Sequence, residues 1–474
     1  MAFHICMAAD ENYVKYAAVL MTSIVRHIDK NISFESLFDY QSNNQDNQSS
    51  INQSINQSIN QSINQSINQS INQSINQSIN QSIRSAELLK NYKKLDYQSL
   101  KDEEKEEKIV FHLLSDFIKE ETLEKLKTLE KELSAIYPTT IQTHILSDEI
   151  FKCFLSLAGK YLNYYRLFIP QLLNNIDTAL YLDVDMLVCA DVRALWTLNL
   201  EGKSTAIVRD WGLSAPLPRK SLHGKADFNF GDFYFNSGFM FLNVKTFREK
   251  NLFEKCLDYL NNYETFLWDQ DALNAVIREN DALMMPFAFN CIAVAYIERA
   301  KTGQFLSRSS FEEMCFWTEN PVILHFAGIV KPWENPFIVQ NEKGEYIGLR
   351  YIEAAKKSFC FADDITKNLI LYAKKIYLSR IVFQYSKNIF GLFKIPFVIT
   401  KIKICDFQKE EILDYLKNYD NDHLFAGFSE NGKDHLIKEF YAKYERAKKT
   451  KSFLYLLKLP LAILKVKRAA KNKS

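Results

Sequence analysis

Two aspartates, Asp183 and Asp185, stand one residue apart inside the apolar run 181–188. The run holds no turn residue, so we expect a buried strand whose charged side chains need compensation. Residues two apart on an extended chain point to the same side, so both carboxylates could approach one divalent cation, directly or through water. The alternative is structural: one aspartate caps the next element and the other pairs with an arginine. The rest of the chain has to decide between the two.

A second group of chemically capable residues follows the apolar residues 322–324. A neutral imidazole at His325 can complete the coordination of a metal that two carboxylates already hold. Gly328 lets the backbone come close to a phosphate, and Lys331 supplies a positive charge. A single histidine after a strand is more often structural, but beside the aspartate pair the ligand hypothesis is favoured. The order histidine, glycine, lysine suits a metal with a diphosphate.

Other polar residues stand where strands or helices begin and end. Asp10 and Asn12 follow the first apolar run, where they could bind a ligand or simply cap the next helix. Arg166 lies among aromatic and aliphatic residues and needs an anionic partner, a protein carboxylate or a phosphate. The triplet 236–238, Asn-Ser-Gly, separates two apolar runs and indicates a sharp turn or a close approach to a ligand. Asp269 opens a predicted helix, for which it could be only the N-cap.

The hydrophobic periodicity predicts the elements that position these residues. Strands are expected at 3–9, 109–114, 141–145, 181–188, 204–208 and 322–325, and helices at 16–28, 123–133, 161–170, 191–195 and 268–274. Strands alternating with helices predict an α/β fold that begins with a βαβ unit. In open α/β sheets ligands lie outside the carboxyl ends of the strands, where Asp10 and Asn12 are expected.

An insertion is predicted at residues 33–107. Residues 51–82 repeat the tetrapeptide Ile-Asn-Gln-Ser without interruption, and a charged, helix-prone segment at 85–108 follows. A period of four matches neither a helix nor a solenoid unit, and one isoleucine in four cannot build a core. We therefore expect this tandem repeat to be a disordered surface loop, with some risk of β-type self-association from its Asn and Gln content.

Composition limits the class of protein. The chain has 474 residues, 47% of them hydrophobic, and a formal net charge of +2, so no overall field marks a nucleic-acid-binding protein. The eight cysteines are scattered without a Cys-x-x-Cys pair, as expected for reduced thiols in the cytoplasm. We expect neither a signal peptide nor a membrane-spanning run.

The carboxyl-terminal region, residues 336–474, is predicted to be helical and basic. Residues 448–474 form a basic, apolar tail that could lie on the inner face of the cytoplasmic membrane. The alternative is a solvated helix or a frayed terminus.

Taken in order, six short motifs between residues 1 and 335 resemble those of the retaining nucleotide-sugar glycosyltransferases of family 8, which includes glycogenin and bacterial lipopolysaccharide galactosyl- and glucosyltransferases. The motifs are Ala8-Ala9-Asp10-Glu11-Asn12-Tyr13, Tyr165-Arg166-Leu167, Tyr181-Leu182-Asp183-Val184-Asp185, Phe235-Asn236-Ser237-Gly238, Asp269-Gln270-Asp271 and His325-x-x-Gly328-x-x-Lys331-Pro332-Trp333. The resemblance implies a Rossmann-like GT-A domain at 1–335 with a mixed sheet. It also implies a UDP-sugar bound with Mn²⁺, or with Mg²⁺ as the alternative.

The resemblance also implies a role for each site residue. Asp183, Asp185 and His325 would hold the metal, Asp183 also contacting the nucleotide sugar, while Asp10 and Asn12 would contact the uridine part, Gly328 and Lys331 the phosphates, and Arg166, Asp210, Asn236, Asp269 and Gln270 the transferred sugar. Asp210, Asp269 and Gln270 are the expected catalytic residues. An amide at Gln270 is a poor nucleophile, so we favour front-face substitution over a two-step route.

The function implied is transfer of glucose or galactose from its UDP-sugar to a lipid-linked oligosaccharide acceptor, the lipopolysaccharide or lipooligosaccharide core. One alternative is a glycogenin-like protein that glucosylates itself. The other is a non-catalytic scaffold that binds sugar nucleotides. The intact motifs argue against the scaffold.

Overall fold

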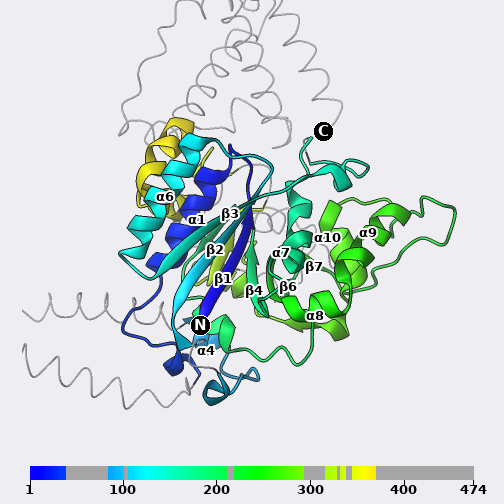
Figure 1. Ribbon diagram of the computed structural model, residues 1–474, viewed down its shortest axis with the longest axis horizontal. Coiled ribbons are helices and arrows are strands. Elements are labelled where there is room, and N and C mark those ends of the chain that lie inside the picture. Colours follow the sequence, from blue (N-terminus) through cyan, green and yellow to red (C-terminus); the bar gives the residue numbers. More distant parts are fainter. Residues whose placement is uncertain are drawn as a thin grey trace, which may run out of the picture. The chain divides into compact units, whose positions relative to one another are not determined.

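The computed structural model of the chain describes residues 1–38, 84–100, 105–157, 159–210, 218–292, 315–327, 331–337 and 344–369 (Figure 1). The Ile-Asn-Gln-Ser repeat, Gly328 and the basic tail at 448–474 lie outside these residues. The chain divides into two compact units, one of residues 1–327 with 356–361 and one of 328–355 with 362–474. Among the helices described, none has the length and apolar character needed to cross a bilayer.

A seven-stranded mixed sheet forms the centre of the first unit, in the order β3-β2-β1-β4-β7-β6-β8. Strand β7 runs antiparallel to both of its neighbours, while β1 pairs in parallel with β2 and β4. The strands are β1 (Ala2–Ala8), β2 (Lys108–Ser115), β3 (Thr139–Ile145), β4 (Thr178–Leu182), β6 (Thr205–Arg209), β7 (Phe235–Asn243) and β8 (Ala282–Met284). The prediction of an α/β fold with a mixed sheet is confirmed.

A second, two-stranded sheet pairs β5 (Met186–Val188) with β9 (Ile323–His325) in antiparallel fashion. The two strands are distant in sequence, and their pairing opposes Met186 to His325. This small sheet therefore brings the end of β9 next to the residues that connect β4 to β5.

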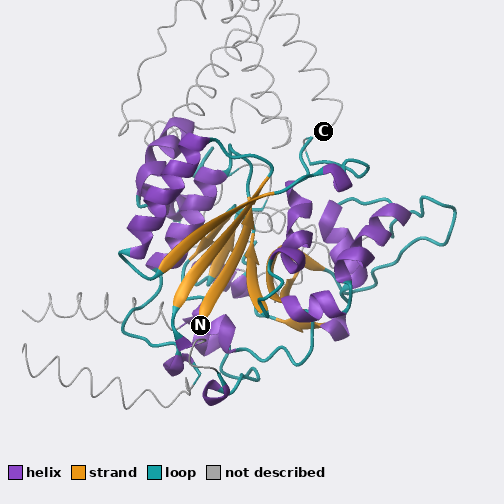
Figure 2. Ribbon diagram, in the orientation of Figure 1, coloured by secondary structure: helices purple, strands orange, loops and turns teal. Residues whose placement is uncertain are grey.

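Helices lie on both sides of the large sheet (Figures 1 and 2). Helices α1 (Val14–Arg26) and α6 (Glu120–Ser134) pack together on one side, while the other side carries α7 (Ile169–Leu172), α8 (Val244–Glu249), α9 (Leu252–Asn262) and α10 (Trp268–Val276). Two further α-helices are α4 (Arg84–Leu88) and α13 (Gly348–Lys356). The 3₁₀-helices are η1 (Glu35–Leu37), η2 (Tyr97–Ser99), η3 (Glu149–Phe151), η4 (Leu162–Phe168), η5 (Arg193–Thr197), η6 (Glu279–Asp281), η7 (Phe287–Phe289) and η8 (Phe359–Phe361).

Alternation along the strands divides the core between the two faces of the sheet. Cys6 and Tyr181 belong to the cluster that packs against α8, α9 and α10. On the other face Trp196 contacts Phe3 and Phe241, with ring centroids 5.2 Å apart in both pairs. Because both faces are buried there, the central strands such as β1 and β2 are mainly hydrophobic, whereas the edge strand β3 is polar and largely exposed.

The buried Arg193 joins the chain on the two sides of the predicted insertion. Its guanidinium pairs with Asp191 and Glu107, each at 2.7 Å, and donates to the carbonyls of Asp29 and Ile32 at 3.0 and 2.9 Å. Asp29 and Ile32 precede the insertion and Glu107 ends it. These contacts hold the two ends of the predicted insertion close together within the first compact unit.

Two local predictions were wrong. The run 181–188 is not one strand, because Asp183, Val184 and Asp185 form a turn between β4 and β5. Strand β7 passes straight through 236–238 instead of turning there. Within the helix-prone segment 85–108, the described residues include α4, η2 and the helical Lys105, while residues 101–104 lie outside them.

The expected helix at 161–170 also differs, because it is the 3₁₀-helix η4 continued by α7. Pro170 stands in the first turn of α7, where the missing backbone N–H removes no helical hydrogen bond. Arg166 therefore lies on a tighter helix than predicted.

Candidate metal centre

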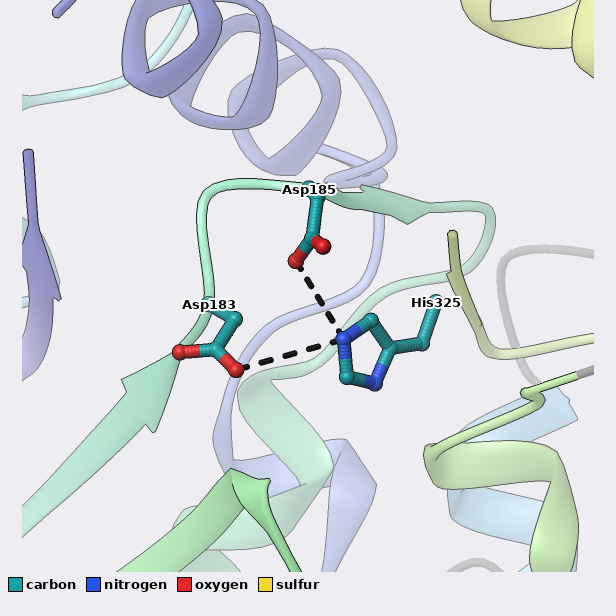
Figure 3. Close-up of side chains that lie close together, drawn as sticks. All are labelled: Asp183, Asp185 and His325. Atoms are coloured by element: carbon teal, nitrogen blue, oxygen red, sulfur yellow. Dashed lines mark ion pairs between the residues drawn. The ribbon is translucent and has the colours of Figure 1, made fainter. Parts of the chain in front are cut away.

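Asp183, Asp185 and His325 form a compact cluster (Figure 3). His325 Nε2 lies 3.2 Å from Asp185 Oδ1 and 3.9 Å from Asp183 Oδ2. The His325 side chain is 3% exposed, against 16% for Asp185 and 28% for Asp183. The structure brings together the three side chains that the sequence analysis assigned to one metal.

Backbone hydrogen bonds hold the cluster from both sides. Asp183 N donates to Gly238 O at 2.9 Å, and Phe326 N donates to Asp185 O at 2.9 Å. These two bonds fix the turn at 183–185. The first bond ties the turn to β7, and the second ties it to the chain leaving β9. The two sheets together thus set the separation of the carboxylates from the imidazole.

Gly238 explains the close approach predicted for the triplet 236–238. A Cβ at this position would lie 2.6 Å from His325 Cε1, 2.7 Å from Asp183 Oδ2 and 2.9 Å from Asn236 Oδ1. The close approach is therefore to the cluster's own side chains. Glycine is needed here for space, because no side chain fits between the strand and the cluster.

The cluster fits a hard divalent cation. One ligand atom from each residue lies within 4.8 Å of the others, and two carboxylates with one imidazole form a ligand set suited to Mn²⁺ or Mg²⁺. With metal–ligand bonds of about 2.1 Å, ligand atoms on one octahedral ion lie about 3.0 to 4.2 Å apart. The two distances from His325 Nε2 to the carboxylates fall inside this interval.

Arg166 connects the cluster to a second buried carboxylate. Its Nη2 donates to Asp183 Oδ1 at 2.9 Å, and its Nε lies 3.0 Å from Asp269 Oδ2. The guanidinium also stacks 4.4 Å from the centre of the Tyr181 ring, whose hydroxyl donates to Asp183 Oδ1. Burial alone would lower the pKa of Arg166, but the two aspartates outweigh it and raise this pKa above its usual value. Of the two partners predicted for Arg166, the structure shows protein carboxylates.

Asp269 is buried and lies one residue inside α10, so it is not the N-cap. Burial raises the pKa of its carboxyl to about 6, while Arg166 and a hydrogen bond from Asn163 oppose that rise. Asn163 Nδ2 donates to Asp269 Oδ1 at 2.9 Å. Ser237 Oγ donates to Asp269 Oδ2 at 3.4 Å. Asp269 is therefore an internal carboxylate held by three neighbouring side chains, two from η4 and one from β7.

Three polar side chains form a row beside the cluster. Asn236 Nδ2 donates to Gln270 Oε1 at 3.1 Å, and Gln270 Nε2 donates to Asp210 Oδ2 at 3.2 Å. These residues come from β7, from α10 and from the end of β6. The structure thus brings together the residues expected to surround a transferred sugar.

The other predicted site residues have different places. Asp10 follows β1, the parallel neighbour of β4, and its Oδ1 accepts from the backbone N–H groups of Asn12 and Tyr13 at 3.0 and 3.1 Å. It therefore does cap the turn into α1, and Asn12 is exposed. Gly328 lies outside the described residues, and Lys331 belongs to the second compact unit.

Sequence reasoning missed two asparagines, the half-buried Asn163 and the buried Asn290. Asn290 accepts from His325 at 2.9 Å and donates to Asn236 at 2.9 Å. The available signal was an amide in the apolar segment 286–292, since a buried amide needs partners. Nothing in the spacing showed what those partners would be.

Comparison with known proteins shows which family and which relatives this chain is similar to. The sequence model of the family described as "Glycosyl transferase family 8" matches residues 82–336. General stress protein A of Bacillus subtilis is 32% identical over 178 residues, 36% of this chain and 59% of that protein, so this chain spans about three fifths of that relative. The lipopolysaccharide 1,2-glucosyltransferase of Escherichia coli is 28% identical over 244 residues, 50% of this chain and 68% of that enzyme. The solved structure of the galactosyltransferase LgtC in complex with donor and acceptor sugar analogs has a TM-score of 0.43 at 17% identity, covering 74% of this chain and 95% of LgtC.

Proposed function

Because the chain belongs to glycosyltransferase family 8 and has the family's GT-A fold, we propose that it is a metal-dependent retaining hexosyltransferase. It transfers glucose or galactose from a UDP-sugar to a glycan acceptor, the lipopolysaccharide or lipooligosaccharide core. The observation that carries this proposal is the cluster of Asp183, Asp185 and His325 beside the hydrogen-bonded row of Asn236, Gln270 and Asp210.

Asp183, Asp185 and His325 would hold Mn²⁺, which supplies positive charge to the diphosphate as it leaves. The two carboxylate oxygens of Asp183 have different partners, because Oδ1 pairs with Arg166 while Oδ2 faces His325. This division fits a carboxylate that serves both the metal and the nucleotide sugar. Lys331 and Gly328 are proposed to contact the phosphates, and Asp10 and Asn12 the uridine part.

The groups around the transferred sugar are well suited to hydroxyls. Asp210 and Asp269 are the acceptors, and Arg166, Asn236 and Gln270 the donors, of this proposed subsite. Gln270 is engaged through both its oxygen and its nitrogen, and an amide is a weak nucleophile. Front-face substitution follows, in which Asp269 and Gln270 orient the sugar and the leaving phosphate takes the proton of the incoming hydroxyl.

The proposed catalytic domain comprises residues 1–335 and is interrupted by the insertion at 33–107. The proposed partners are a UDP-hexose donor and a lipid-linked oligosaccharide acceptor. The basic region at 336–474 would hold the enzyme at the cytoplasmic membrane surface, close to that acceptor. Sedimentation with anionic liposomes tests this part, and equal binding by a chain cut near residue 445 would exclude the tail.

The experiment that tests the function is a donor screen. Purified protein is incubated with Mn²⁺, a panel of UDP-sugars and truncated core oligosaccharides, and product NMR gives the sugar and the linkage. Release of UDP and a retained anomeric configuration are expected for one donor. Hexoses found on the protein itself by mass spectrometry would favour self-glucosylation, and no turnover with any donor would favour a scaffold.

Two substitutions connect this activity to the cluster. Asp185→Asn and His325→Ala are expected to abolish metal-dependent transfer while the protein stays folded. Asp281→Asn is the matched control, because Asp281 pairs with Lys250 at the start of β8 and touches no residue of the cluster. A cluster variant with near-normal turnover would defeat the assignment.

A further inference from the structure

Asn290 is completely buried and makes hydrogen bonds with two residues of the proposed site. Its Oδ1 lies 2.9 Å from His325 Nδ1, and its Nδ2 donates to Asn236 Oδ1 at 2.9 Å. It follows η7, and the backbone beside it is fixed because His325 N donates to Cys291 O at 3.0 Å. Asn290 therefore lies between the imidazole and strand β7 with both ends of its amide engaged.

Backbone donors determine which way the amide points. Gly238 N donates to Asn236 Oδ1 at 3.0 Å, so the Asn236 atom facing Asn290 is an oxygen. An oxygen there requires the nitrogen of Asn290, which leaves Asn290 Oδ1 facing His325. Since that oxygen can only accept, His325 Nδ1 carries the proton. With the proton on Nδ1, Nε2 is the ring atom that faces Asp185 and Asp183 and that would bind a cation.

The same direction continues through the sugar side of the site. Ser237 N donates to Gln270 Oε1 at 3.0 Å, which identifies that atom as the acceptor for Asn236 Nδ2. Gln270 Nε2 then donates to Asp210 Oδ2. A row of four hydrogen bonds thus runs one way from the imidazole N–H to a carboxylate.

We propose that Asn290 is a positioning residue for the metal centre, which fixes the Nδ1–H tautomer of His325 and ties this ligand to the row of Asn236, Gln270 and Asp210. A neutral imidazole bound to a cation through Nε2 donates more strongly from Nδ1, and aligned hydrogen bonds strengthen one another. Binding of a cation at the metal centre would therefore strengthen the hydrogen bonds of the amides that orient the sugar. The part that concerns metal and sugar rests on the proposed function, whereas the proton on Nδ1 is a property of the metal-free protein.

Two substitutions separate a positioning role from a structural one. Asn290→Ala removes both hydrogen bonds. Asn290→Asp keeps an acceptor oxygen for His325 Nδ1 whether or not the new carboxyl is protonated. Asn243→Ala is the matched control, because Asn243 caps α8 at the opposite end of β7 from Asn236.

The first measurement is ¹⁵N NMR of the full-length, metal-free protein labelled in its histidines, with His325→Ala used to assign the ring signals. The wild type, Asn243→Ala and Asn290→Asp are expected to show His325 protonated at Nδ1. Asn290→Ala is expected to lose this pattern. If Asn290→Ala showed the same Nδ1–H pattern as the wild type, the proposal would be overturned.

The second measurement is Mn²⁺ affinity by calorimetry, with the melting temperature recorded for each variant. Asn290→Ala is expected to bind Mn²⁺ about 10- to 100-fold more weakly, as for other residues that orient a metal-bound histidine. Asn290→Asp should bind nearly as the wild type does, and Asn243→Ala should melt earlier with unchanged affinity. If affinity followed the melting temperature in all three variants, Asn290 would be merely structural and the proposal would fail.

The outcomes for the two proposals can be told apart. A wild type that turns over no UDP-sugar would count against the proposed function and leave the tautomer result standing. If Asn290→Ala does not fold, the aspartate variant decides, because a folded Asn290→Asp without the Nδ1–H pattern contradicts the inference.

Discussion

Substituting Gly238 by alanine should disable the metal centre while leaving the fold intact. The added Cβ would lie 2.6 Å from His325 Cε1 and 2.7 Å from Asp183 Oδ2. Because relaxed carbon contacts begin near 3.5 Å, both groups must move away by roughly 0.8 to 0.9 Å. Neither can do so easily, since Asn290 holds the imidazole and Arg166 holds the carboxylate. A displacement of about 1 Å at a reacting site can cost about 100-fold in rate.

The expected result for Gly238→Ala is therefore a loss of about 100-fold in turnover, together with weaker Mn²⁺ binding. Overpacking costs about 1–3 kcal/mol of unfolding free energy, so the variant should remain folded. UDP release and Mn²⁺ calorimetry measure the first two effects, and urea unfolding measures the third. Ala179→Val is the control, because it overpacks β4 in the core at a position outside the cluster. Normal turnover and Mn²⁺ affinity in Gly238→Ala would refute the view that the ligands are locked in place.

Two further predictions concern pH. Ionised Asp269 pairs with Arg166, and its pKa of about 6 means that kcat/KM should fall as the pH drops below about 6. Asn163→Ala removes a hydrogen bond that lowers this pKa, so the acid limb should move to higher pH; a pH–rate profile with an unmoved limb would contradict this. His4 and His112 lie on neighbouring strands with ring nitrogens 2.9 Å apart, and burial lowers their pKa values to about 4 and about 3. As the pH falls, the unfolded chain binds protons at these histidines before the folded chain does. The free energy of unfolding should therefore be highest above pH 6.5 and fall towards pH 4, by up to about 1.4 kcal/mol per pH unit for each histidine. His112→Gln should flatten this dependence in urea unfolding at pH 7 and pH 5, and an unchanged slope would exclude the histidines as its cause.

The meeting of these residues was predictable from the sequence because Asp183 and Asp185 interrupt one apolar run and His325 follows another. Charged or ionisable side chains at such positions need partners, and a single cation is the partner that we propose for all three. Strands β1, β2 and β9 and helices α1 and α6 were predicted for the same reason, since their hydrophobic periodicity reports burial directly, whereas α8, α9 and β8 were not predicted. Even so, the turn at 183–185 was missed, because Val184 is as apolar as a residue within a strand.

What the sequence could not show is the contacts between elements far apart in the chain. Asn290 and Asn236 are 54 residues apart, and the chain next to Asn290 is held on β9 by the hydrogen bonds of Cys291 with Ile323 and His325. The need for glycine at Gly238 likewise depends on side chains that come from β9 and from the turn after β4. Periodicity places a residue on an element, but the neighbours of that element follow from tertiary packing alone.

The most direct test of the central claim is a titration of Mn²⁺ into protein stripped with a chelator, with UDP release from the preferred UDP-hexose measured at each step. The cluster of Asp183, Asp185 and His325 predicts no release without metal, and release that rises to saturation as a single site per chain fills. The same titration should leave Asp185→Asn inactive at every concentration. Undiminished release from the stripped protein, or a normal titration curve from Asp185→Asn, would contradict the assignment of this cluster as the catalytic metal centre.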